Sequence, residues 1–234
     1  MRLFWVRNLI LASISACGLP LQADEADFNI NPLKTPIITE RNWVLPEFNQ
    51  QLNQFFAWLP KKIYVDEEPE QHSITDFSWV QKNNYQLGFT DKILIRGMVL
   101  STREYHDDNK SDIAPMDIVI GWKKMSDPDV VSKVYIMQNR RFYFWKVNEF
   151  PISRGEIEGY STNLHIVPDN EQIASRLKNM RVGDIVSLEG YLTDVKDEDE
   201  RIWVTSRVRN DSGDGACEIV LVKNFSIIDR LKPN

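Results

Sequence analysis

The fold prediction starts from one stretch of the sequence, DIVSLEGYLTDVKDEDERIWVTSRV, residues 184–208. Its first half alternates apolar and polar residues, so that Val186, Leu188 and Leu192 share one face. Its second half alternates in the same way, and an acidic turn separates the two halves. Alternation with a period of two is typical of half-buried strands. We therefore expect a β-hairpin, and the two apolar faces can meet only in an even register, because a slip of one residue turns a strand over.

In the register that we predict for this hairpin, Tyr191 lies opposite Thr205 and Glu189 lies opposite Arg207. The face away from the apolar residues then carries Tyr191, Trp203 and Arg207. Aromatic and guanidinium groups on a sheet face are suited to stacking on bases or sugars, so these three residues are candidate ligand-binding residues. Cross-strand stabilisation is the alternative, and we favour it because Glu189 and the acidic turn disfavour a polyanionic ligand.

Further strands are predicted on both sides of this hairpin. They are KILIRGMVL (92–100), MDIVIGW (116–122), VYIMQNRRFYFWKV (134–147) and CEIVLVKNFSII (217–228), with GYSTNLHIV (159–167) as an additional, weaker candidate. A helix is predicted at 170–180, where Ile173, Leu177 and Met180 recur at helical spacing. The order of three strand regions, a helix and two or three more strands resembles that of an OB-like barrel, which has one helix between its third and fourth strands. We expect a mainly β (α+β) domain of this kind over 90–230, and a β-sandwich is the alternative.

The residues before this domain form an expected appendage, 24–70. It begins as an extended arm punctuated by prolines and ends in an acidic linker, DEEPEQH (66–72). Between them, PEFNQQLNQFFAWLP (46–60) places five apolar side chains on one helical face, with prolines near both ends. We expect a short helix docked on the main domain, because its polar face holds Asn and Gln and lacks the Lys and Arg of a membrane-surface helix.

The first 23 residues are typical of an export signal. Arg2 and Arg7 precede an apolar run that ends at Gly18 and Pro20, which is too short for a membrane span. We favour cleavage after Ala23. In the alternative, residues 14–17 resemble a lipobox, and Cys17 is lipidated and anchors the protein to a membrane. Both alternatives predict an exported protein of the periplasm or cell envelope.

A second aromatic stretch, QNRRFYFWKV (138–147), is predicted to be part of one strand. Strand parity then puts Phe142 and Phe144 on the core face and Arg141, Tyr143 and Trp145 on the other. The latter three are candidate ligand-binding residues if their face is open. We favour the alternative, in which the N-terminal arm and helix cover them, because aromatic side chains of this size are strongly buried.

No framework for catalysis, a metal or a cofactor is found in the sequence. The loop around His106, Asp107 and Asp108 lacks the spacing of known metal motifs. His165 lies within a strand pattern, and we predict a hydrogen-bonded structural histidine there. Hence we predict no catalytic residue, no metal and no cofactor.

These observations predict a non-catalytic, exported bacterial envelope protein that binds a protein partner or an envelope glycan. The runs 114–127 and 213–222 resemble stretches of uncharacterised exported bacterial proteins, which supports the compartment only. Loss of residues 1–23 removes two arginines and no acidic residue, so the net charge of −6 becomes −8. Such a chain repels nucleic acid. A secreted, nuclease-like hydrolase is the alternative function, with Asp117, Glu189 and Arg207 as its candidates.

Overall fold

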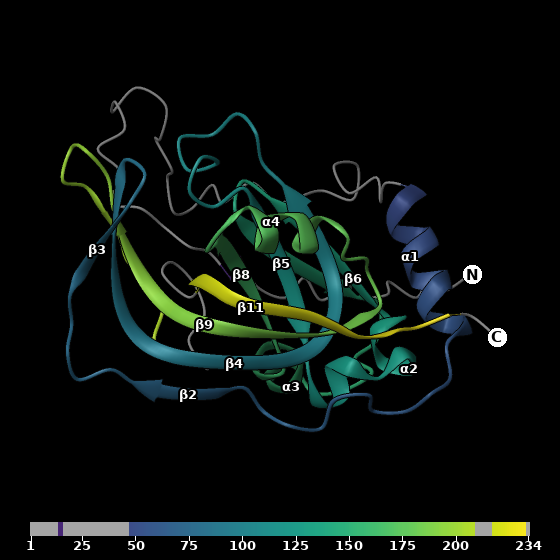
Figure 1. Cartoon of the computed structure of the whole chain (residues 1–234). Coiled ribbons are helices and arrows are strands. Elements are labelled where there is room, and N and C mark those ends of the chain that lie inside the picture. The colour runs from purple at the N-terminus through teal and green to yellow at the C-terminus, as the bar shows by residue number, and fades with distance from the viewer. Residues whose placement is uncertain (1–13, 16–46, 209–216, 233–234) are drawn as a thin grey trace, which may run out of the picture.

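The computed structural model describes residues 14–15, 47–208 and 217–232. This part of the chain is mainly β (Figure 1). Its helices are α1 Glu47–Trp58, the 3-10 helix η2 Lys123–Ser126, α2 Pro128–Val131, α3 Arg154–Gly159 and α4 Glu171–Lys178. Its strands are β1 Ile14–Ser15, β2 Glu70–Ser73, β3 Trp79–Lys82, β4 Tyr85–Glu104, β5 Met116–Gly121, β6 Val134–Asn139, β7 Phe142–Val147, β8 Ser161–Pro168, β9 Asp184–Lys196, β10 Ile202–Trp203 and β11 Glu218–Arg230.

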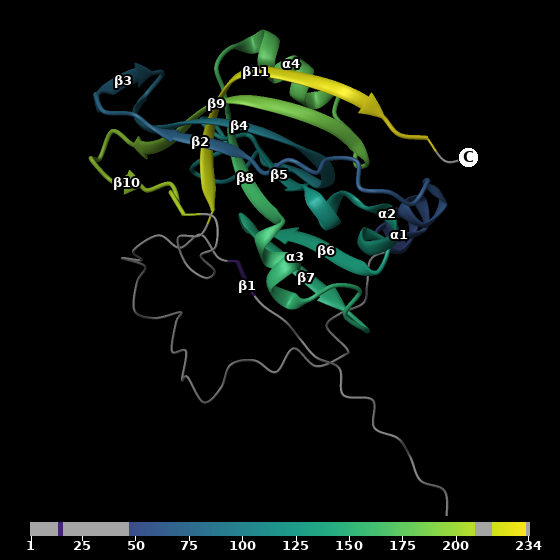
Figure 2. The ribbon, with the colours of Figure 1, turned by 90° about the horizontal axis from the view of Figure 1, so that it is seen from below.

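Most of the strands belong to one large sheet, in the order β10-β9-β11-β8-β5-β4-β2, and β3 also pairs with β4. The strands β4 and β9 pair with each other as well, from Gln86↔Lys196 to Met98↔Ile185. All of these pairs are antiparallel except β8 with β11. The long strands β4 and β9 curve along the molecule, with β3 near one end and α1 and α2 near the other (Figures 1 and 2).

The large sheet is buried on both of its faces. The larger core contains inward residues of β4, β5, β8 and β9, such as Ile95, Ile118, Ile166 and Leu188. A smaller core combines other positions of β4, β8 and β9 with residues of β10, β11 and the segment between β4 and β5, and contains Leu87, Ile113, Ala114, Val167, Val195, Trp203, Ile219 and Leu221. All six residues of β5 are buried, and its apolar side chains Met116, Ile118, Val119 and Ile120 belong to the larger core.

The sequence predicted most of these elements correctly. The segments 92–100, 116–122, 159–167, 184–195 and 217–228 lie largely within β4, β5, β8, β9 and β11, and the mainly β class is confirmed. The helix predicted at 170–180 is α4, whose first turn is capped by the Asn170 side chain through the backbone N–H groups of Gln172 and Ile173. The strands β2 and β3, the first part of β4 and the helix α3 were not predicted.

The prediction of a single strand over 134–147 is wrong. Strands β6 and β7 form a hairpin that pairs Asn139 with Phe142, and Arg140 and Arg141 form its turn with φ of 48° and 70°. The predicted alternation holds within β7, but the opposite face is the buried one. Phe142 and Phe144 are only half-buried, whereas Tyr143 and Trp145 are 3% and 4% exposed and belong to the larger core.

The predicted hairpin at 184–208 needs a correction as well. Its second strand, β10, has only two residues, and Trp203 pairs with Val195, so that the register differs by two residues from the predicted one. Tyr191 lies between Lys92 of β4 and Leu221 of β11 and is not paired with Thr205. The faces are exchanged too, because Trp203 is buried while Ile202 and Val204 are exposed.

The predicted appendage is partly described. In α1 and just after it, Phe56 and Leu59 are buried in the larger core, and the Asn53 side chain donates to the carbonyl of Ser132 (2.9 Å). Part of the predicted acidic linker is β2, which pairs with β4. Of the predicted signal, only Ile14 and Ser15 are described, as β1 beside β7.

The remainder of the signal, with Cys17 and the cleavage site, and the arm before residue 47 lie outside the described residues. Among the helices that the structure describes, none combines the length and the apolar character that a membrane crossing requires.

Candidate functional site

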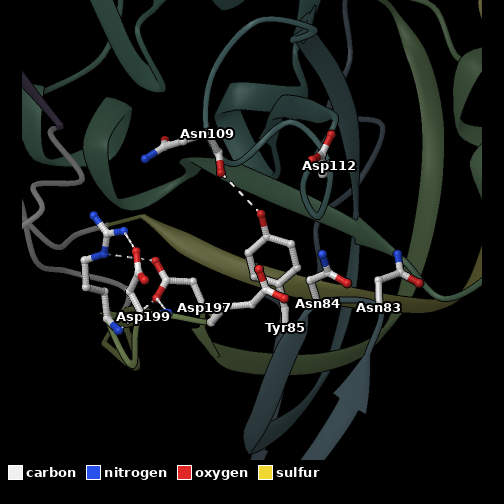
Figure 3. Close-up of a pocket in the computed structure, with 9 residues that line it drawn as sticks. Asn83, Asn84, Tyr85, Asn109, Asp112, Asp197 and Asp199 are labelled. Carbon is white, nitrogen blue, oxygen red and sulfur yellow. Dashed lines mark hydrogen bonds and ion pairs between the residues drawn. The ribbon is translucent and has the colours of Figure 1, made fainter.

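An open polar cleft of about 490 Å³ lies at the end of the sheet where β3, β4, β9 and β10 turn (Figure 3). Three segments that are distant in sequence line it. The turn between β3 and β4 and the start of β4 supply Asn83, Asn84 and Tyr85. The loop 105–115, between β4 and β5, supplies Asn109 and Asp112, and the turn between β9 and β10 supplies Asp197, Glu198, Asp199 and Arg201.

Tyr85 lies between the walls of this cleft. Its hydroxyl donates to the backbone carbonyl of Asn109 (3.3 Å), which ties β4 to the loop 105–115 (Figure 3). Burial raises the pKa of Tyr85, and the carboxylates of Asp112, Asp197 and others add to the effect. The Tyr85 hydroxyl therefore remains a hydrogen-bond donor at neutral pH.

The carboxylates of the cleft outnumber its cations. Arg201 pairs with Asp197 (3.2 Å) and with Asp199. Asp112 and Glu198 have no ion-pair partner among the residues that the structure describes. The cleft thus offers amide, carboxylate and phenol groups that can bind hydroxyl or amine groups, and its negative potential repels phosphate.

Behind the loop 105–115 lies a buried polar cluster centred on Asp117 of β5. One oxygen of Asp117, Oδ1, lies 2.8 Å from Nδ1 of His165 and 3.1 Å from a terminal nitrogen of Arg141. Asp117 and His165 are fully buried, and Arg141 is 8% exposed. Asp108 completes the cluster, because both of its oxygens accept hydrogen bonds from Arg141 (2.7 and 2.8 Å).

Uncharged side chains extend this cluster along β8 and β6. Asn163 accepts a hydrogen bond from Gln138 (2.8 Å) and donates one to the carbonyl of Arg141 (3.3 Å). Three buried atoms, Oδ2 of Asp117, Oε1 of Gln138 and Nε2 of His165, have no hydrogen-bond partner in the described structure. The charged groups are nevertheless paired, as buried charges require, and the predicted hydrogen bonding of His165 is present in its contact with Asp117.

Trp203 links the cluster to the loop 105–115. Its ring lies 4.7 Å from that of His165, and Nζ of Lys110 lies 3.8 Å from its centroid. Burial lowers the pKa of Lys110 to about 8, and repulsion by Arg141 acts in the same direction. Lys110 is therefore packed into the wall that the loop 105–115 forms, and its neighbours in sequence, Asn109 and Asp112, face the cleft.

The structure separates the six predicted ligand-binding residues. Arg141 belongs to the buried cluster, Tyr143 and Trp145 to the larger core, and Trp203 to the smaller one. Tyr191 is half-buried and stacks on Phe89 with ring centroids 5.0 Å apart. Arg207 is exposed and pairs with Asp194 (3.1 Å). They form no common surface, and none of them lines the cleft.

The three residues predicted for a hydrolase pair with different partners and not with one another. Asp117 is paired with His165 and Arg141, Glu189 with Lys92 and Asn224, and Arg207 with Asp194. Within 47–208 and 217–232, no three His, Cys, Asp or Glu side chains gather in a way that suits a metal ion.

The cleft itself was missed by the sequence analysis. Its residues lie in turns and in a loop. The acidic turn at 197–200 and the polar loop around Asp108 are visible in the sequence, but nothing in the sequence indicates that they lie side by side. Comparison of the chain with family models, with curated proteins and with solved structures gave no match.

Proposed function

We propose that this chain is an exported, OB-like β module that binds an uncharged, polyhydroxylated ligand, an envelope glycan, in the cleft and does not transform it. The observation that carries the proposal is the position of the cleft between two particular loops.

The ring of strand pairings supports an OB-like barrel. Starting from β4, each strand pairs with the next in the series β5, β8, β11, β9 and back to β4. In chain order these are strands one to five of a five-stranded unit, with α4 between the third and the fourth. An OB-fold has this number of strands, and its helix lies at this place. A sandwich of two open sheets would leave edge strands, whereas this ring is closed because β4 pairs with β9 over 86–98 and with β5 over 98–104.

The cleft lies between the loops that bind ligands in OB-folds. In that fold, the loops between strands one and two and between strands four and five bind oligonucleotides or oligosaccharides. Here these are the loop 105–115 and the segment that follows β9, which includes the turn 197–200. Both of them line the cleft.

The lining chemistry favours sugars among these ligands. Asp112, Asp197, Glu198 and Asp199 would repel the phosphates of a nucleic acid, whereas amides and carboxylates bind sugar hydroxyls directly. A volume of about 490 Å³ is in the range of small-ligand sites. No contact of Asp117, Glu189 or Arg207 favours the nuclease-like alternative.

Binding measurements test this proposal. Isothermal titration calorimetry with uncharged envelope oligosaccharides, such as oligomers of N-acetylglucosamine, should give saturable binding, and a single-stranded oligonucleotide of similar length should not bind. Asp112→Asn with Asn109→Ala should weaken sugar binding at least tenfold. The matched control is Glu189→Gln with Asn224→Ala, a pair of side chains joined outside the cleft (3.1 Å). Binding to the oligonucleotide alone, or to no oligosaccharide, would refute the proposal.

The exported location is a separate part of the proposal. It is supported by the charged and then apolar order of residues 2–19. Mass spectrometry of the N-terminus from a bacterial envelope fraction would distinguish a chain beginning at Asp24 from one beginning at a lipidated Cys17. Recovery of an intact Met1 in the cytosol would contradict export.

A further inference from the structure

The loop 105–115 contains no helix or strand, yet it supplies one wall of the cleft. A binding site on such a loop needs other contacts to fix the shape of the loop, because a mobile wall loses affinity through the entropy of ordering. The question is therefore which side chain holds Asn109 and Asp112 in place.

The guanidinium group of Arg141 donates hydrogen bonds to this loop near both of its ends. Arg141 donates to both oxygens of Asp108 (2.7 and 2.8 Å), next to Asn109, and to the carbonyl of Ala114 (2.7 Å). The same group is anchored to the large sheet through Oδ1 of Asp117 (3.1 Å). Its Cζ atom lies 3.8 Å from the ring centroid of Tyr105, whose hydroxyl oxygen accepts a hydrogen bond from the Arg141 backbone N–H (3.1 Å).

The residue that holds the loop, Arg141, lies outside the large sheet. Arg141 is the second turn residue of the β6–β7 hairpin, which belongs to the smaller sheet. Its carbonyl oxygen accepts a hydrogen bond from Asn163 of β8 (3.3 Å), which fixes the turn itself. A bidentate pair of Arg with a carboxylate defines both distance and orientation, which a lysine ammonium cannot do.

We propose that Arg141 is a positioning residue for the cleft: by holding Asp108 and Ala114, it fixes Asn109 and Asp112 in their ligand-binding geometry. This inference rests on the proposed function. Arg141 does not touch the ligand and acts through the loop 105–115.

The chain offers two matched pairs of variants. Asp108→Asn removes the negative charge that pairs with Arg141, and Asp107→Asn makes the same change on the neighbouring exposed residue. Likewise, Arg141→Gln removes the guanidinium group that holds the loop, and Arg140→Gln changes the other, exposed turn residue. Arg141→Lys keeps the charge and removes the planar fork.

The expected result has two parts. In hydrogen-exchange mass spectrometry, Asp108→Asn and Arg141→Gln should speed exchange at least tenfold in peptides covering 105–115, with unchanged exchange in β9. In calorimetry, both should weaken oligosaccharide binding at least tenfold, while Asp107→Asn and Arg140→Gln should remain within twofold of the wild type. Arg141→Lys should not restore the affinity, which separates geometry from net charge.

The outcomes are distinguishable. If Arg141→Gln fails to fold, Asp108→Asn still tests the proposal, because it leaves the contacts of Arg141 with Asp117 and Ala114. If the wild type binds no oligosaccharide, the proposed function fails, and hydrogen exchange alone decides whether Arg141 holds the loop. If the wild type binds but Asp108→Asn and Asp107→Asn have equal affinities, the positioning role is wrong.

Discussion

Nδ1 of His165 lies 2.8 Å from Oδ1 of Asp117, and both side chains are fully buried. The two residues are register partners on β8 and β5, so the sheet itself brings the imidazole and the carboxylate together. The same oxygen accepts a hydrogen bond from Arg141 (3.1 Å). Asp117 thus joins the large sheet to the β6–β7 hairpin through a single carboxylate.

Removal of that carboxylate should therefore be severely destabilising. Asp117→Ala leaves the buried guanidinium of Arg141 with one charged partner and leaves His165 without its acceptor. Loss of one partner from a buried ion pair typically costs about 3–5 kcal/mol. Urea unfolding should show a decrease of this size in the free energy of unfolding. Asp112→Ala, at an exposed position of the adjoining loop, should change it by no more than about 0.5 kcal/mol. Equal effects of the two variants would contradict the role of Asp117.

Lys110 should lose its proton at a lower pH than other lysines of the chain. Burial, followed by repulsion from Arg141, lowers its pKa to about 8 from an ordinary value of 10.5. Between these two values the unfolded chain binds more protons at this site than the folded chain, so the contribution of Lys110 to stability rises with pH in that window. Acetylation with acetic anhydride at pH 7 to 11, followed by peptide mass spectrometry, should give a midpoint near 8 for Lys110.

Lys92 is the internal comparison for this titration. Its hydrogen bond with Glu189 raises its pKa above 10.5, so its labelling should rise only at the alkaline end of the range. Because the two lysines differ in exposure, the midpoints are compared and not the absolute rates. A common midpoint for both lysines would show that the ammonium of Lys110 is solvated.

Strand positions were predictable from this sequence, and so was the apolar face of β9 with Val186, Leu188 and Leu192, but the second buried face was not. Alternation identified β9 and β11 because burial in the larger core favours apolar residues at every second position. Some of the remaining positions then looked solvent-exposed, yet Val195, Ile219 and Leu221 belong to the smaller core together with Trp203. A strand that is buried on both faces gives no period from which the outer side can be identified.

Two features of the candidate site had no local signal. A two-residue hairpin turn usually contains Asn or Gly, because both residues need positive φ. The turn before Phe142 has two arginines instead, and the second is retained there by its ion pairs with Asp108 and Asp117. The cleft depends on three connections that only the strand order brings together, so no single stretch of sequence could indicate it.

The pairing of β9 with β11 should tolerate no side chain at position 190. A Cβ atom on Gly190 would overlap the carbonyl oxygen of Leu221, and that atom belongs to the backbone of a paired strand and cannot rotate away. Gly190→Ala should therefore lower the free energy of unfolding by about 3 kcal/mol or more. Gly155→Ala in α3 is the control, since nothing lies within 4 Å of its Cβ. That variant should be neutral or more stable by up to about 1 kcal/mol. A small effect at position 190 would mean that β9 and β11 are not packed this closely.

The two turn arginines should respond oppositely to glycine. Both have positive φ, 48° for Arg140 and 70° for Arg141, a conformation that costs about 1–2 kcal/mol per residue for side chains with a Cβ. Glycine removes this strain but increases the entropy of the unfolded chain by about 0.5–1 kcal/mol. At the exposed position 140 the net result should lie between no change and a gain of about 1.5 kcal/mol.

At position 141 the same relief is outweighed. Arg141→Gly leaves the buried Asp117 with His165 alone and leaves Asp108 without its bidentate partner, which should cost about 3 kcal/mol or more. Urea unfolding of both variants measures the contrast directly. If Arg141→Gly were as stable as Arg140→Gly, the ion pairs would contribute nothing net, and the turn would owe its sequence to some property other than stability. The opposite signs are expected because one backbone strain is uncompensated, whereas the other is held by two carboxylates from different elements.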